Sequence, residues 1–305
     1  MAKIEPLKAV RTRNPGWNLD SVLDDLRLSR EVTHSIRHGG HVRELPSPQA
    51  MLDVIEGLCT ALFPTHLGQA ALSRENTDVF VSTILTTALT RLAEQVRRGL
   101  QFGVNGPEPA DLLKVRAEEI TQDFAQALPA VRASLVGDLK AAYLADPSAG
   151  SIAEILLCNR GATAIIYHRI AHALHRLGAR LVARVIADLA HATTGIDIHP
   201  GAHIGERFLI SHGTGLVIGE TALVGSNVQL AQGVTLGALP LRNTSLTRPS
   251  GRRHPVIEND VIIHAGATVL GAITIGQGAV IGGNVWATED VAAGTELLQA
   301  STKAQ

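Results

Sequence analysis

The chain has 305 residues, with 27 Lys and Arg against 28 Asp and Glu, so its net charge of -1 excludes a strongly basic surface for nucleic acid or anionic lipid. Hydrophobic residues make up 45% and charged residues 18%, which is typical of a globular protein of two domains or one large one. Two cysteines far apart predict a reducing compartment. No apolar run reaches the roughly 18 residues of a membrane span or forms a signal core, so we expect a cytoplasmic protein.

The first part of the chain has the apolar period of helices, and we predict an α-helical domain over residues 1–192. The clearest example is the set Met51, Leu52, Ile55, Leu58, Cys59 and Leu62. Asp146-Pro147 resembles a helix start, with an N-cap followed by proline at the first helical position. We expect one last long helix from near Ala162 to near His191.

After Gly195 the spacing of aliphatic residues becomes six. The residues at this step are Ile198, Ile204, Ile210, Leu216, Ala222, Val228 and Val234, then Ile257, Ile263, Val269, Ile275 and Ile281. This period predicts a solenoid of about four triangular coils over residues 193–305, in which each aliphatic residue points inward. The fold class is therefore α+β. Glycines such as Gly205 and Gly225 fall near the expected corners, where the chain must turn tightly.

The two runs are separated by a basic loop, which we place at residues 240–254. It contains Arg242, Arg248, Arg252 and Arg253 together with Pro249 and Gly251. Insertions at the corners of solenoids often line a binding face, although a solvated loop without function is an equally simple interpretation.

Several polar residues interrupt the aliphatic pattern and are candidates for chemistry. A histidine near a carboxylate can act as a general base, and His212 and Asp197 are such residues. They lie fifteen residues apart, which is less than a coil of about eighteen, so they need not meet within one chain. Arg253 is suited to hold a substrate carboxylate with two hydrogen bonds.

Several motifs of the chain resemble those of the serine O-acetyltransferases. They are Asp197-Ile198-His199-Pro200-Gly201-Ala202, Ser211-His212-Gly213-Thr214-Gly215, Val217-Ile218-Gly219-Glu220-Thr221, Gln232-Gly233-Val234-Thr235-Leu236-Gly237, Arg253-His254-Pro255 and Ile281-Gly282-Gly283-Asn284. The likeness covers roughly residues 140 to 290. Leu45-Pro46-Ser47 and Leu62-Phe63-Pro64 are similar to segments of the longer bacterial branch of that family.

The resemblance implies a left-handed parallel β-helix in trimers or dimers of trimers, with acetyl-CoA as co-substrate, no metal, and active sites between chains. The implied catalytic residues are His212 as base, Asp197 orienting a catalytic histidine of a neighbouring chain, and Glu220 as electrostatic support. The implied serine-binding residues are Asp146, Ser211, Arg253 and His254. Coenzyme A is expected near Gly237, Ala238, Ala265 and Gly283, where small residues allow a close approach.

Two departures from the family pattern leave alternatives open. Ser211 stands where the family usually has an aspartate, so another hydroxylated amino compound such as homoserine, or a non-catalytic scaffold, are alternatives to L-serine acetylation. The chain ends at Gln305 without the isoleucine-ended tail that binds cysteine synthase, so we expect no tight complex with that enzyme. A zinc site built from His199 and His203 with His212 or His264 is a further alternative.

Overall fold

The computed structural model of the chain describes residues 17–33, 44–68, 73–103, 109–239 and 251–299. The chain divides into two compact units, residues 1–43 and residues 44–305. In the first unit, helix α1 (Asp20–Leu28) continues directly into a short π-helical turn, η1 (Ser29–Thr33). Everything that bears on the candidate site belongs to the second unit.

The first half of the second unit is helical, as predicted. Its helices are α2 (Pro48–Leu62), α3 (Pro64–Leu67), α4 (Arg74–Gly103), α5 (Ala110–Ala145), α6 (Ile152–Cys158), α7 (Arg160–Arg176) and α8 (Arg180–Thr194). The single last helix that we predicted is instead the pair α7 and α8, because Gly178 adopts a φ of 94° between them. The predicted N-cap at Asp146 is also wrong. Asp146 ends α5, and Ser151 caps α6 by accepting a hydrogen bond from the Glu154 N–H.

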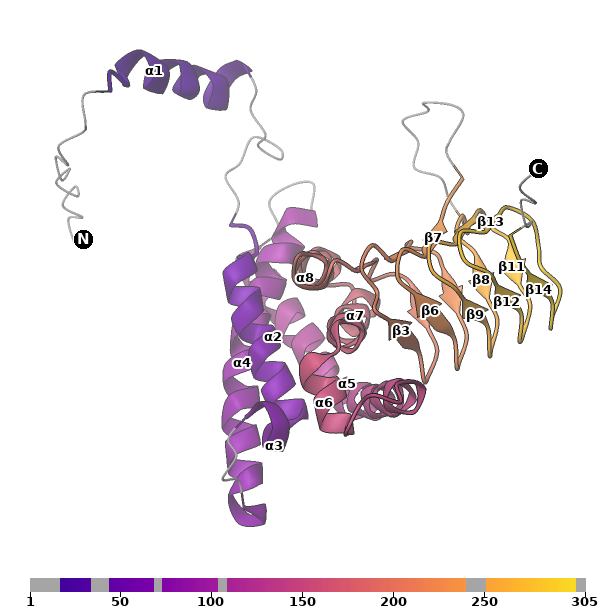
Figure 1. The fold of residues 1–305 in the computed structure, drawn as a ribbon. Coiled ribbons are helices and arrows are strands. Elements are labelled where there is room, and N and C mark those ends of the chain that lie inside the picture. Colours follow the sequence, from indigo (N-terminus) through magenta and orange to yellow (C-terminus); the bar gives the residue numbers. More distant parts are fainter. Residues whose placement is uncertain (1–16, 34–43, 69–72, 104–108, 240–250, 300–305) are drawn as a thin grey trace, which may run out of the picture. The chain divides into compact units, whose positions relative to one another are not determined.

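The second half of this unit is a parallel β-helix (Figure 1). Its strands are β1 (Asp197–Ile198), β2 (His203–Ile204), β3 (Leu209–Ser211), β4 (Val217–Ile218), β5 (Leu223–Val224), β6 (Gln229–Ala231), β7 (Thr235–Gly237), β8 (Val256–Ile257), β9 (Ile262–Ile263), β10 (Thr268–Leu270), β11 (Thr274–Ile275), β12 (Val280–Ile281), β13 (Trp286–Ala287) and β14 (Glu296–Leu297). They form three parallel sheets, in the orders β1-β4-β7-β10-β13, β11-β8-β5-β2 and β14-β12-β9-β6-β3. The predicted solenoid of about four coils is thereby confirmed.

All twelve aliphatic residues of the six-residue period are buried, but the register changes once along the run. Ile198 pairs with Ile218, twenty residues later, whereas Ile218 pairs with Leu236, eighteen residues later. The first coil therefore contains two extra residues. After this insertion, the residues that continue the six-residue step no longer lie in the strands, but two positions before the buried strand residues. They are Leu216, Ala222, Val228 and Val234, and the corresponding strand residues are Ile218, Val224, Leu230 and Leu236. The residues two positions before each strand residue and the strand residues themselves are all buried. For this reason aliphatic residues still recur every six positions across the insertion.

Gly205 and Gly225 serve close packing of the coils and not tight turning. Neither Gly205 nor Gly225 has a positive φ. A Cβ atom on Gly205 would lie 2.6 Å from the carbonyl oxygen of Gly225, and one on Gly225 would lie 2.8 Å from the backbone nitrogen of Asn259. Each coil thus rests on the backbone of the next at these positions, and a side chain would hold the coils apart.

The helical part leads into the β-helix at Gly195. This residue closes α8 with a φ of 70°, and its N–H donates to the His191 carbonyl. Strand β1 begins two residues later, while α5 and α7 pack against β3. Helices and β-helix belong to one compact unit, and a domain boundary between residues 192 and 193 stays a prediction. The part of the chain that the structure describes contains no helix long and apolar enough to cross a membrane.

Candidate active site

The extra two residues of the first coil form the corner that carries His212. Strand positions Ile210 and Ile218 are eight residues apart instead of six, so the corner between them is longer than the other corners of this coil. His212 has a φ of 59°, and Gly213 and Gly215 have φ values of 87° and 77°. A left-handed backbone is uncommon for histidine and often marks a functional position. The corner leaves the His212 side chain exposed beside the helical part.

A pocket of about 300 Å³ opens next to this histidine. Its lining residues are Ala142, Ala145, Asp146, Ser148, Asn159, Leu209, Ile210, Ser211, His212 and Gln229. Asp146 supplies the carboxylate, whose Oδ1 accepts hydrogen bonds from the Ser148 hydroxyl at 2.6 Å and the Ser148 N–H at 2.9 Å. These hydrogen bonds, and to a smaller extent the charge of His212, hold the pKa of Asp146 below its usual value. The pocket therefore presents an ionised carboxylate close to a candidate base.

A second group of predicted residues is organised by Thr221. Its hydroxyl oxygen accepts the N–H groups of Arg253 (3.0 Å) and His254 (3.1 Å), and it lies 2.8 Å from Nδ1 of His254. The backbone N–H of Thr221 also donates to this Nδ1, at 3.1 Å. Because Nδ1 accepts, the ring proton of neutral His254 is on Nε2. Burial lowers the pKa of His254, and the positive charge of Arg253 lowers it further, which favours this neutral donor form.

Arg253 and Glu220 face a larger groove of about 810 Å³. The lining residues are His175, Arg180, Arg184, His199, Glu220, Thr221, Ala238, Leu239, Gly251 and Arg253. Nη2 of Arg253 lies 2.5 Å from Oε2 of Glu220, and this hydrogen bond keeps the pKa of Glu220 below its usual value. Three arginines with one carboxylate make the groove suitable for an anionic ligand.

The remaining predicted residues lie elsewhere on the β-helix. Asp197 begins β1 and is half-buried, and no hydrogen bond joins it to His212 within the described part of the chain. Gly237 ends β7 and pairs with Leu270. Ala265 and Gly283 are neighbours on successive coils, since a Cβ on Gly283 would lie 3.3 Å from the Ala265 carbonyl oxygen.

The predicted residues thus form two groups on one chain. Asp146, Ser211 and His212 line the smaller pocket, whereas Glu220, Ala238 and Arg253 line the larger groove, and Thr221 holds His254 next to Arg253. Within a single chain, the candidate base His212 and the candidate carboxylate-binding residue Arg253 therefore line different pockets.

Several residues that contribute to these sites were missed from the sequence, among them Arg180 and Arg184 in the larger groove. Thr221 belongs to a motif that we singled out, but a hydroxyl holding two distant backbone groups leaves no pattern in the sequence. Ser148 follows Asp146 by two residues, which is the spacing of a side-chain turn and could have been noticed. Asn159 and Gln229 come from the start of α7 and from β6, and only the folding of the chain brings them to the pocket.

Helix α7 carries three histidines in successive turns, His168, His172 and His175. His168 is 3% exposed, and burial lowers its pKa well below the usual value. Nδ1 of His172 lies 2.9 Å from the Pro200 carbonyl oxygen, and its ring packs against His203. His172 therefore joins α7 to the first coil. Among the described residues, no three His, Cys, Asp or Glu side chains are grouped to hold a metal.

The basic loop is only partly described. Arg242, Arg248 and the rest of residues 240–250 lie outside the described residues, as does the C-terminal segment 300–305. At the end of the loop, Arg252 donates to the Ala272 carbonyl at 3.0 Å, and Arg253 enters the groove.

A parallel β-helix of six-residue repeats, with a histidine at an enlarged corner and a carboxylate across a small pocket, defines an enzyme of the hexapeptide-repeat acyltransferase class. No family model matches the chain. The chain is 47% identical over 297 residues to a plasmid serine acetyltransferase of Synechococcus elongatus, covering 94% of this chain and 92% of the relative. It is 47% identical to a serine acetyltransferase of Bacillus licheniformis over 50% of this chain and 68% of that protein.

Solved structures agree with these relatives. The chain resembles a serine acetyltransferase isoform of Entamoeba histolytica in complex with cysteine, with a TM-score of 0.71, 29% identity and coverage of 93% and 92% of the two chains. It also resembles a Neisseria gonorrhoeae serine acetyltransferase in complex with serine, with a TM-score of 0.54, 29% identity and coverage of 84% and 97%. The chain belongs to the serine acetyltransferase family.

Proposed function

We propose that the protein transfers an acetyl group from acetyl-CoA to the hydroxyl of L-serine, giving O-acetylserine and CoA, as the first step of cysteine biosynthesis. The observation that carries this proposal is the pocket in which Asp146 and His212 face a space of about 300 Å³. A carboxylate can bind the ammonium group of serine, and a base can activate its hydroxyl, so this pocket supplies groups for both. Membership of the serine acetyltransferase family supports the choice of reaction.

In this proposal His212 is the general base. Its ring takes the serine hydroxyl proton as the oxygen attacks the thioester carbonyl carbon. When the tetrahedral intermediate collapses, the C–S bond breaks, and the proton passes from His212 to the departing sulfur. A thioester is already activated, so the chemistry requires no metal. Asp197, which does not contact His212 in one chain, would orient a catalytic histidine of a neighbouring chain.

The two ends of serine would be held by groups from two chains. Asp146 binds the ammonium, and Ser211 adds a hydroxyl beside it. Arg253 and the Nε2–H of His254 would hold the carboxylate from a neighbouring chain, with Glu220 keeping the guanidinium in place. The separation of these groups on the single chain supports a site completed by oligomerisation, as a trimer or a dimer of trimers.

Coenzyme A would bind along the β-helix next to this site. Ala238 lines the larger groove, and Gly237 precedes it at the end of β7. Ala265 and Gly283 offer a second surface of small residues, where the pantetheine arm could approach the backbone.

The proposal is tested by following thiol release from acetyl-CoA with L-serine, L-homoserine, a sugar or no acceptor. We expect serine-dependent release, and a loss of about 10²- to 10⁴-fold in His212→Ala. His191→Ala is the matched control, because His191 is exposed in the last turn of α8 and lies in neither site. Release without serine dependence, or an unaffected His212→Ala variant, would contradict the proposal.

The lining of the described pocket also suits a second acceptor. Asp146 is the one carboxylate among its lining residues. Ser211, Asn159 and Gln229 surround it with neutral polar groups. An acceptor one methylene longer, such as homoserine, would use the same base and the same acetyl donor. Faster thiol release with L-homoserine than with L-serine would favour this acceptor and leave the mechanism unchanged.

A further inference from the structure

A buried ion pair joins the helical part to the first coil at one point. Arg169 of α7 donates from Nε to Oδ2 of Asp138 at 2.9 Å and from Nη2 to Oδ1 at 3.0 Å. The same guanidinium donates to the carbonyls of Ile204 at 2.7 Å and Gly205 at 2.6 Å, and Asp138 Oδ1 accepts the Phe208 N–H at 2.9 Å. We call Asp138 and Arg169, with these backbone partners, the clamp.

A buried ion pair of this kind contributes little net free energy to the stability of the fold. The Asp138 side chain is 3% exposed and that of Arg169 is 12% exposed. Burial raises the pKa of the Asp138 carboxyl, and the Arg169 guanidinium acts against this shift. Removing two charges from water offsets much of their attraction, and apolar side chains can often replace such a pair at no loss. What the clamp adds is a defined geometry, because a bidentate guanidinium fixes both distance and orientation.

Two segments that span similar distances run from the clamp to the pocket of the candidate site. Helix α5 continues from Asp138 to Asp146, which is eight residues or about 12 Å of helix. The chain also continues from Phe208 through β3 to His212, which is four residues or about 13 Å of strand. Both segments start at the clamp, and both end in the lining of the same pocket.

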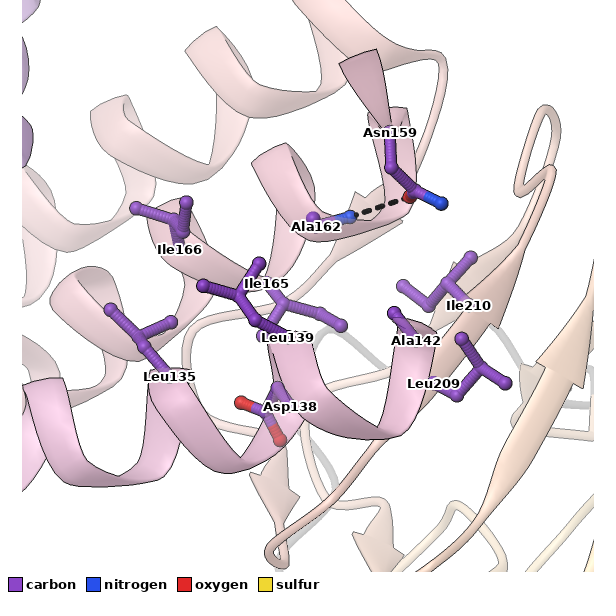
Figure 2. Close-up of a pocket in the computed structure, with 10 residues that line it drawn as sticks. All are labelled: Leu135, Asp138, Leu139, Ala142, Asn159, Ala162, Ile165, Ile166, Leu209 and Ile210. Carbon is purple, nitrogen blue, oxygen red and sulfur yellow. Dashed lines mark hydrogen bonds between the residues drawn. The ribbon is translucent and has the colours of Figure 1, made fainter. Parts of the chain in front are cut away.

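Between the clamp and the pocket, little side-chain volume separates these segments. Ala142 of α5 lies beside Leu209 and Ile210 of β3, around a small cavity of about 10 Å³ (Figure 2). Ala142 is 6% exposed, and its single methyl group sets a close approach of helix and strand. A displacement of α5 at the clamp would therefore be carried along the helix to Asp146.

We propose that Asp138 and Arg169 are positioning residues that set the distance between Asp146 and His212 and so determine the affinity for the amino acid substrate. This inference rests on the proposed function, since it assigns serine to the pocket. The acetyl donor would bind the β-helix away from α5, and the clamp therefore acts on one substrate and not on the other.

The test is the variant Asp138→Asn in the full chain, because asparagine keeps the shape and one oxygen acceptor but removes the charge. We expect the KM for L-serine to rise at least about tenfold, since misplacement by about 1 Å can cost that much or more. The KM for acetyl-CoA should stay within about twofold. The matched control is Glu94→Gln, which removes a carboxylate that Arg97 and Arg98 contact at 2.7 Å in α4, away from the pocket.

A second variant keeps the inference testable if Asp138→Asn does not fold. Arg169→Lys leaves the lining of the pocket unchanged and keeps the positive charge but loses the two-pronged hydrogen bond to Asp138, and it should raise the KM for L-serine in the same selective way. Circular dichroism and oligomer mass establish that each variant is folded. The positioning role is overturned if the folded variants keep the KM for L-serine of the unmodified protein. It is also overturned if their KM values for L-serine and acetyl-CoA rise by the same factor. Absence of serine-dependent turnover in the unmodified protein would instead overturn the proposed function, and the positioning role with it.

Discussion

Replacing Thr221 by valine removes one hydroxyl that organises the Arg253 and His254 group. The substitution keeps the shape of the side chain, so its effect comes from hydrogen bonding. The hydroxyl accepts the N–H groups of Arg253 and His254 and contacts Nδ1 of the His254 ring at 2.8 Å. Valine offers no replacement for any of these three interactions.

The magnitude follows from these three hydrogen bonds. At about 0.5–1.5 kcal/mol each, their loss would lower the free energy of unfolding by about 1.5–4.5 kcal/mol. Thr221 is only half-buried, so water can replace part of the loss, and we expect about 2 kcal/mol. For a chain of this length this is a fall of about 3 °C in the midpoint of thermal unfolding. The His254 ring also loses one of the two donors to its Nδ1, so the KM for L-serine should rise about tenfold.

Thr221→Ser is the control, because it retains the hydroxyl and loses only a methyl group. Scanning calorimetry and thiol-release kinetics measure the two effects on the same preparations. The reasoning is refuted if the valine variant matches the serine variant in both the unfolding midpoint and the KM for serine.

Two further predictions concern the coils and the response to acid. Gly225→Ala should lower the free energy of unfolding by about 1–3 kcal/mol, because its Cβ would meet the backbone of Asn259. Gly137→Ala should be neutral or stabilising, since that glycine is in a helix with space around it; equal unfolding midpoints for the two would contradict this account. The pKa of Glu220 is lowered by its hydrogen bond to Arg253, so its stabilisation is present above the unfolded pKa and is lost as the pH falls through the folded one. Glu220→Gln should therefore show a smaller loss of thermal midpoint between about pH 6 and pH 3, and an unaltered acid profile would argue against the ion pair.

Much of the fold could be predicted because the chain repeats one local rule many times. The aliphatic step of six after Gly195 indicates a β-helix, since only inward-facing positions of a solenoid need this spacing. All twelve of the predicted positions are buried. The helical period of the first part predicts helices in the same way, while their ends were less predictable. Gly178 divides the last helix, and the cap of α6 is Ser151.

The candidate site could be predicted only as a set of residues. His212 could be singled out as a base from its chemistry, whereas Asp146 was assigned to the substrate only through the resemblance to the serine O-acetyltransferases. The two-residue insertion before Ile218 was hidden, because the inward positions of successive coils continue the six-residue step across it. The aliphatic pattern alone therefore does not predict that His212 lies on an enlarged corner.

The class of the protein follows from its sequence, because repeats and motifs are local and each residue acts through its near neighbours. Which side chains meet depends on how distant parts of the chain pack together. The clamp joins residues 31 positions apart, and Thr221 holds groups 32 and 33 positions away. Such contacts depend on how helix and coil pack as bodies, and a single sequence has no periodicity that encodes the distance between them.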